Sequence, residues 1–247
     1  MSSYKNHIIF SLILTFPFFP DVFYLSLAVI GASLVDLDSK YRNKNLLILA
    51  LSGGFFSLLL HFFNISIFPG LILISISLLF FISKHRGFMH SIMGIILAAL
   101  LLSLFTMSVL LSLQYIHLLF KAALFLTSAF LGIMILNKKL VIPYIVVLSL
   151  GLLLTPLLGF NAYFVFGAVF LGSLSHLILD LFTPSGVKIF KPVLSRKMGK
   201  ITGMLLLTLW LMAIILVYGF NYYSPSYSWW IKNREDPLNY LLFIIQS

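Results

Sequence analysis

The sequence predicts an all-α, polytopic membrane protein with about seven spanning helices and a short helical hairpin at the N-terminus. Of the 247 residues, 61% are hydrophobic and only 9% are charged, and apolar stretches recur along the whole chain. About 20 apolar residues span the hydrocarbon core of a bilayer, where a helix satisfies its own backbone hydrogen bonds. No hydrophilic stretch is long enough to fold alone. We therefore expect one integral membrane domain over residues 1–247, with the motifs in 1–200 and a last span and aromatic tail in 201–247.

The N-terminal hairpin is predicted from two closely spaced prolines. The stretch Pro17-Phe18-Phe19-Pro20 interrupts the first apolar run. Proline ends a helix and pushes the preceding residue toward an extended conformation. We expect a short helix over residues 5–16 and a return helix over 22–35, which brings the following residues back to the side of the membrane where the chain begins.

Seven further apolar stretches are predicted to be helical. The second of them is short for a full crossing, and Ser52-Gly53-Gly54 in the first predicts close packing against a neighbouring helix. The predicted helices cover residues 45–63, 70–83, 91–111, 116–136, 140–158, 162–182 and 201–220.

The basic residues predict the orientation in the membrane. The formal net charge is +10, but the cations lie in short loops, so we expect contacts with lipid headgroups and no nucleic-acid partner. If successive predicted spans cross the membrane in opposite directions, most of the cations lie on one side. By the positive-inside rule, this is the cytoplasmic side of a prokaryotic inner membrane. These cations are Lys5, Lys40, Arg42, Lys44, Lys84, Arg86, Lys138, Lys139, Lys188, Lys191, Arg196, Lys197 and Lys200.

The same alternation brings histidines and aspartates from four distant segments to that cytoplasmic side. The chain has only six acidic residues and six histidines. Ionisable groups at membrane depth are costly unless they are paired, hydrated or bound to a metal, so they are candidates for a functional site. The candidate metal ligands are His7, Asp36, Asp38, His85, His90, His176 and Asp180.

His176 and Asp180 are four residues apart, so a helix projects both from one face. Imidazole nitrogen and carboxylate oxygen form a ligand set that suits zinc best, with manganese or iron as alternatives. The number of candidates allows one or two ions. The alternative interpretation of this pair is a hydrogen bond on the helix surface.

The Asp36-Leu37-Asp38 element lies at the end of a predicted helix, where both carboxylates can turn toward one cation. If coordination leaves Asp38 unused, its carboxylate is the candidate general base that takes a proton from water. The alternative is a hydrated pair in a loop, balanced by Lys40 and Arg42.

His85 and His90 flank Gly87 just before the next predicted helix. Arg86 is always charged and matches a phosphate in a two-pronged geometry, which makes it a candidate catalytic residue for phosphate binding. The alternative for Arg86 is a contact with lipid headgroups. His61 and His117 fall near the opposite ends of their spans and are expected to be structural or interfacial.

Several familiar active-site patterns are missing. Cysteine is absent, which excludes thiolate ligands and disulfides. The sequence also has no glycine-rich phosphate loop, no HExxH and no GxSxG. The His/Asp clusters are therefore the chemistry that this chain offers.

In order and spacing, these motifs resemble the YdjM-like family of inner-membrane metal-dependent hydrolases. The matching elements are the early histidine, the DxD element, the His-Arg-Gly-x-x-His-Ser element (residues 85–91), and a C-terminal block from Gly172 through Pro184 to Pro192. The family pattern often has proline before the DxD and histidine after it, where this chain has Val35 and Ser39. The resemblance implies a metal-dependent hydrolase. A more distant similarity is to the His/Asp zinc sites of phospholipase C enzymes.

The function that these observations favour is a membrane-embedded, metal-dependent hydrolase. We expect it to cleave a membrane lipid or lipid-linked (phospho)ester at the cytoplasmic interface, using metal-activated water. A divalent metal-ion transporter is the first alternative, although such sites usually lie near the bilayer midplane. The second is a non-catalytic membrane protein whose metal holds short helices together.

Overall fold

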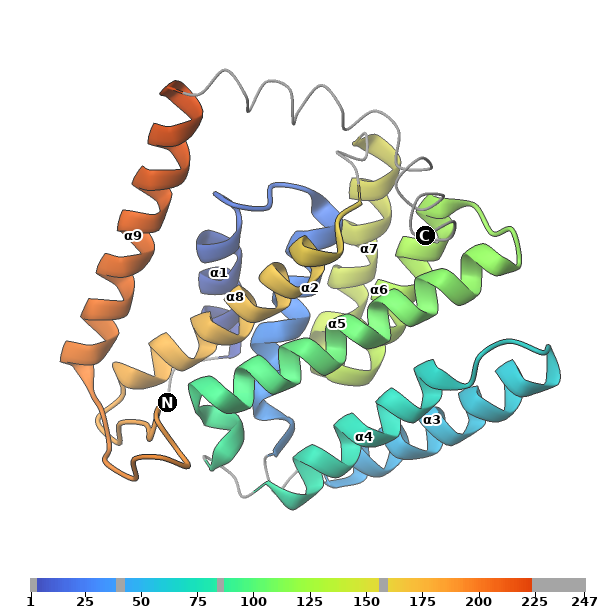
Figure 1. Ribbon diagram of the computed structural model, residues 1–247, viewed down its shortest axis with the longest axis horizontal. Helices are drawn as coiled ribbons and strands as arrows, with labels where there is room; N and C mark the ends of the chain where they lie inside the picture. The colour runs from blue at the N-terminus through green and yellow to red at the C-terminus, as the bar shows by residue number, and fades with distance from the viewer. Residues whose placement is uncertain (1–3, 39–42, 84–86, 156–159, 224–247) are drawn as a thin grey trace.

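The computed structural model describes residues 4–38, 43–83, 87–155 and 160–223. Within these ranges the chain is mostly helical, and the predicted fold class is confirmed (Figure 1). The α-helices are α1 (Tyr4–Thr15), α2 (Val22–Leu34), α3 (Asn43–Phe62), α4 (Phe68–Ile82), α5 (Ile92–Tyr115), α6 (Phe120–Ile135), α7 (Lys138–Leu154), α8 (Ala162–Leu181) and α9 (Lys200–Tyr223). The predicted tail after residue 223 lies outside the described residues.

Most helix boundaries follow the predicted ones closely, but α5 differs at its end, α6 begins at Phe120 instead of 116, and α7 ends at Leu154 instead of 158. The hairpin of α1 and α2 is present, and Asp21 caps α2 by accepting a hydrogen bond from the amide of Phe23 at 2.8 Å. Helix α5 continues four residues past its predicted end at 111. Ser108 and Ser112 each bond back to a carbonyl of the preceding turn, so they continue the helix instead of ending it.

Three of the described helices are long and apolar enough to cross a bilayer by themselves. They are α5, α8 and α9, whereas the apolar stretches in α2, α3, α4 and α6 are shorter. Helix α1 has 12 residues and extends for about 18 Å, which is little more than half of the ~30 Å hydrocarbon core. The number of full crossings therefore remains a prediction, while the integral membrane character is clear.

The centre of the bundle is the contact between α2 and α8, which run side by side in the same direction (Figure 1). Almost every residue of α2 is buried, as expected of a helix that is apolar on all sides. The backbones approach closely because the facing residues are small: a Cβ on Gly172 would collide with the carbonyl of Ala28, and one on Gly31 with that of Val169. Ser173 adds a hydrogen bond of 3.0 Å to the Gly31 carbonyl.

Two parts of the structure are peripheral. The α3–α4 hairpin packs through Gly53, whose Cβ would meet the Gly70 carbonyl at 2.8 Å, so the predicted close packing in this stretch is confirmed. Helix α9 lies at the edge of the molecule (Figure 1), and only 6% of its apolar stretch is buried. Its indole Trp210 donates to the Leu14 carbonyl at 3.0 Å. Lipid is therefore the expected environment of most of α9.

Replacing Gly172 with alanine should destabilise the protein, because the new Cβ overlaps the Ala28 backbone. We expect a loss of about 1–3 kcal/mol in the free energy of unfolding, as for other overpacked cores. Thermal unfolding of the purified protein in detergent, followed by circular dichroism, measures the effect. The matched control is Gly54→Ala, because a Cβ at Gly54 meets nothing within 4 Å and alanine favours a helix. Equal stability of Gly172→Ala and the wild type would contradict this account of the α2–α8 contact.

Candidate metal centre

Four helix ends meet at one end of the bundle and bring ionisable side chains together (lower left in Figure 1). His7 lies in the first turns of α1. Asp36 lies in a 3-10 turn, η1 (Val35–Asp38), that continues α2. His90 ends a second 3-10 turn, η3 (Phe88–His90), just before α5. His176 and Asp180 lie one turn apart near the end of α8.

The ligand atoms of these five residues lie close together. Nε2 of His176 is 3.5 Å from Oδ1 of Asp36 and 3.6 Å from Oδ2 of Asp180, and Nε2 of His90 is 3.7 Å from the same Asp180 oxygen. One ligand atom each from His7, His176 and Asp180 lie within 4.8 Å of one another, and so do those of Asp36, His90 and His176. Four of the five residues are buried, whereas 32% of the Asp36 side chain is exposed. The cluster is therefore open on the Asp36 side.

His176 is the common member of both groups, and the other two histidines pack against its ring. The His7 ring stacks on it with a centroid distance of 3.9 Å and an interplanar angle of 19°. The His90 ring meets it edge to face, with a centroid distance of 5.7 Å and an angle of 78°. The three imidazoles thus form one compact unit around His176.

The orientation of the His176 ring is set by the backbone of α2. Its Nδ1 lies 2.8 Å from the carbonyl oxygen of Ala32. A carbonyl oxygen only accepts hydrogen bonds, so we assign the proton to Nδ1, which leaves the lone pair of Nε2 directed at the two carboxylates. A backbone carbonyl on the remote nitrogen is the usual support of a metal-binding histidine.

This arrangement fits a divalent cation. A neutral imidazole that points its lone pair at two carboxylates repels them unless a positive charge lies between. The three nitrogen–oxygen distances of 3.5–3.7 Å exceed the usual hydrogen-bond range. They are close to the ~3.3 Å that separates ligands around a tetrahedral zinc with bonds of about 2.0–2.1 Å.

The turn that carries His90 is held in place by Ser91, the N-cap of α5, and by Gly94 in the first turn of that helix. Ser91 caps α5 by accepting from the Gly94 amide at 3.1 Å, and its hydroxyl donates to the Phe88 carbonyl at 2.6 Å. A Cβ on Gly94 would collide with that carbonyl, so the turn can fold back only over a glycine. The amide of Ile92 then donates to the Ile189 carbonyl at 2.9 Å. These contacts direct His90 toward Asp180.

The structure brings together five of the seven predicted ligands. Asp38 belongs to η1 by its backbone, but its side chain lies outside the described residues, as do His85 and Arg86 as a whole. Their roles as ligands, general base and phosphate-binding group stay predictions. His61 and His117 are exposed and apart from the cluster.

The supporting groups around His176 were not anticipated from the sequence. They are the Ala32 carbonyl, the Ser173–Gly31 hydrogen bond and the glycine contacts between α2 and α8. The available signal was the run of small residues just before each functional group. Gly31-Ala32-Ser33 precedes Asp36, and Gly172-Ser173 precedes His176.

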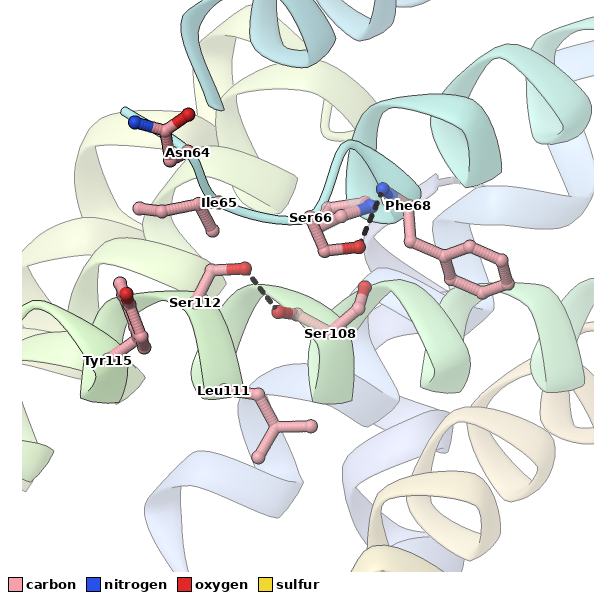
Figure 2. Close-up of a pocket in the computed structure, with 9 residues that line it drawn as sticks. Asn64, Ile65, Ser66, Phe68, Ser108, Leu111, Ser112 and Tyr115 are labelled. Carbon is pink, nitrogen blue, oxygen red and sulfur yellow. Dashed lines mark hydrogen bonds between the residues drawn. The ribbon is translucent and has the colours of Figure 1, made fainter. Parts of the chain in front are cut away.

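A hollow of about 410 Å³ lies at the opposite end of α5, between that helix and the α3–α4 turn (Figure 2). Its polar lining consists of hydroxyl and amide groups, and no acid, base or histidine contributes to it. Ser66 accepts a hydrogen bond from the Phe68 amide at 3.4 Å, and Ser112 donates to the Ser108 carbonyl at 2.8 Å. This hollow offers no general acid, base or metal ligand.

The chain belongs to the YdjM inner membrane protein family, whose family model matches residues 3–245. This match covers almost the whole chain and confirms the resemblance drawn from its motifs. It also supports an inner-membrane location. No curated protein and no solved structure matches the chain.

We expect the purified protein to hold a divalent metal through this cluster. The double variant His176→Ala plus Asp180→Ala should lose that metal, because His176 belongs to both ligand groups and Asp180 lies 3.6 Å from the Nε2 of His176 and 3.7 Å from that of His90. Elemental analysis by mass spectrometry after removal of loosely bound ions measures the metal-to-protein ratio. The control is His61→Ala plus His117→Ala, which removes two exposed histidines outside the cluster. Equal metal content in the wild type and the cluster variant would refute metal binding here.

Proposed function

We propose that this protein is a membrane-embedded, metal-dependent hydrolase that cleaves a lipid-linked phosphoester at the cytoplasmic interface. The observation that carries the proposal is the His/Asp cluster itself: three imidazoles and two carboxylates, four of these groups buried, gathered at one end of an apolar bundle. Ionisable groups in such surroundings are costly and point to function.

In this proposal His7, His90, His176, Asp180 and Asp36 hold a divalent cation, with zinc as the first choice for a nitrogen and oxygen ligand set. Such a cation supplies a nucleophilic water near neutral pH and polarises a phosphoryl oxygen. The buried members of the cluster exclude bulk water from the ion. The partly exposed Asp36 lies at the side from which substrate approaches.

Two further residues have proposed roles in the reaction. Asp38 follows Asp36 in the same 3-10 turn, and we propose that its carboxylate accepts the proton of the attacking water. Arg86 lies two residues before the turn that carries His90 in the sequence, and we propose that its guanidinium binds the substrate phosphate. Both assignments are supported by sequence position and chemistry.

The depth of the cluster supports a lipid-linked substrate and a hydrolase rather than a transporter. The ligands lie in the end turns of their helices, which supports a site near an interface rather than at the midplane where transport sites usually lie. An ester bond at the junction of headgroup and acyl chain lies at this same depth. A substrate held in the bilayer therefore reaches the open side of the cluster without leaving the membrane.

Replacing Asp36 with asparagine should abolish most phosphoesterase activity while preserving size and helix packing. We expect a fall in turnover of at least about 100-fold, since even the outer partners of metal ligands can cost that much. Release of phosphate or headgroup from phospholipid and polyprenyl-phosphate panels in detergent measures it. The matched control is Asp21→Asn, because Asp21 caps α2 at its other end and asparagine caps equally well. Turnover that survives in Asp36→Asn, or that falls equally in both variants, would rule out this role.

The proposed orientation can be tested in intact cells, because the chain has no cysteine of its own. We expect Ser185→Cys, beyond the end of α8 on the cluster side, to resist a membrane-impermeant maleimide. Ser66→Cys, in the α3–α4 turn at the opposite end, should react with it. Both serines are exposed. The reverse labelling pattern would place the cluster on the outer face.

A further inference from the structure

The segment between α8 and α9 (residues 182–199), called here the α8–α9 loop, has a defined backbone. Val187 and Met198 exchange two backbone hydrogen bonds of 3.0 and 2.8 Å across it. Gly186 has φ +59°, and a Cβ there would meet the Met198 carbonyl at 2.5 Å, so this turn requires glycine. The loop is therefore a folded element and can present its side chains in a fixed arrangement.

The inner side of the loop is attached to the His/Asp cluster. Val187 and Ile189 are buried in a small apolar cluster that includes Val35, the residue before Asp36. The Ile189 carbonyl also accepts from the Ile92 amide, two residues after His90. The loop is thus joined to the two turns that supply Asp36 and His90, and whatever binds its outer side is held beside the candidate metal centre.

The outer side of the loop combines positive charge with exposed apolar side chains. Phe190, Val193 and Leu194 are all exposed, Val193 at 78%. Residues 182–200 contain no acidic residue. The cations of this stretch are Lys188, Lys191, Arg196, Lys197 and Lys200.

We propose that the outer side of the α8–α9 loop is a binding surface for anionic phospholipid, and that it selects a negatively charged lipid for the candidate metal centre. The cations pair with headgroup phosphates, while Phe190, Val193 and Leu194 enter the acyl layer beneath. The lipid binding stands on the loop alone. Only the statement that the bound lipid is the substrate rests on the proposed function.

The charge complementarity favours a bilayer lipid over other anionic partners. A loop that bound only a soluble anion would gain nothing from three exposed apolar side chains among its cations. Lysine and arginine extend their charge outward while their stems cover apolar surface, which is the arrangement seen at membrane interfaces. The juxtaposition of Leu194 with Lys191 and Arg196 therefore fits one occupant, the anionic leaflet surface.

Lipid binding can be measured by native mass spectrometry of the full-length protein in detergent, without metal or turnover. We expect phosphatidylglycerol to bind about tenfold more tightly than phosphatidylcholine, since each cation near an anionic surface strengthens the attraction to it. Lys191→Ser plus Arg196→Ser should reduce this preference to about twofold or less. The matched control is Lys138→Ser plus Lys139→Ser, which removes two exposed cations from the start of α7.

Retention of the full preference in the loop variant would overturn the proposal, and so would an equal loss in the α7 control. Because this assay requires no hydrolysis, a negative result here leaves the proposed function intact. If binding is normal and no lipid is cleaved, the proposed function fails and the binding surface stands.

The depth of the loop gives a second, independent test. A spin label on Leu194→Cys, in vesicles of equal phosphatidylglycerol and phosphatidylcholine, should be more accessible to oxygen than to a water-soluble nickel complex. A label on Ser185→Cys, the control on the same loop, should show the opposite preference. Equal exposure of both labels to the nickel complex would show that the apolar side chains stay in water and would contradict insertion.

Discussion

The close contact between α2 and α8 is the constraint on which the rest of the structure depends. Gly31 and Gly172 let the two backbones approach until the Ala32 carbonyl reaches the Nδ1 of His176. That one hydrogen bond turns the other nitrogen of the ring toward Asp36 and Asp180. A bulkier interface would separate the helices and move His176 away from its partners. The packing of small residues in the apolar part of the bundle thus determines the chemistry at its end.

The cluster also explains why helices too short to cross alone end where they do. Helices α1 and α2 form a hairpin whose open end carries His7 and Asp36, and α8 brings His176 to the same depth. Five ionisable groups in an apolar surrounding are costly to bury unless they are paired with one another or bound to a cation. A metal at this position would therefore contribute to the stability of the short hairpin as well as to the proposed reaction.

Much of the fold could be predicted from sequence because apolar length and proline position act locally. The hairpin at residues 17–20 and the run of helices to α9 follow from these signals alone. The predicted end of α5 at 111 was wrong, because the helix continues to Tyr115, with the hydroxyls of Ser108 and Ser112 bonded within it. The gathering of histidines and aspartates at one end followed from alternating the spans. Their orientation did not, because it depends on the Ala32 carbonyl and on the turn over Gly94, which are backbone contacts between distant segments.

The central claim is that a cation lies between the imidazole of His176 and its two carboxylates. X-ray absorption spectroscopy at the metal edge of the purified protein tests it most directly. The account predicts a shell of nitrogen and oxygen at about 2.0–2.1 Å, with the outer scattering of imidazole rings and no sulfur. This imidazole signal should disappear in His176→Ala. A spectrum of a hydrated ion without imidazole scattering, or one unchanged in the variant, would contradict the account.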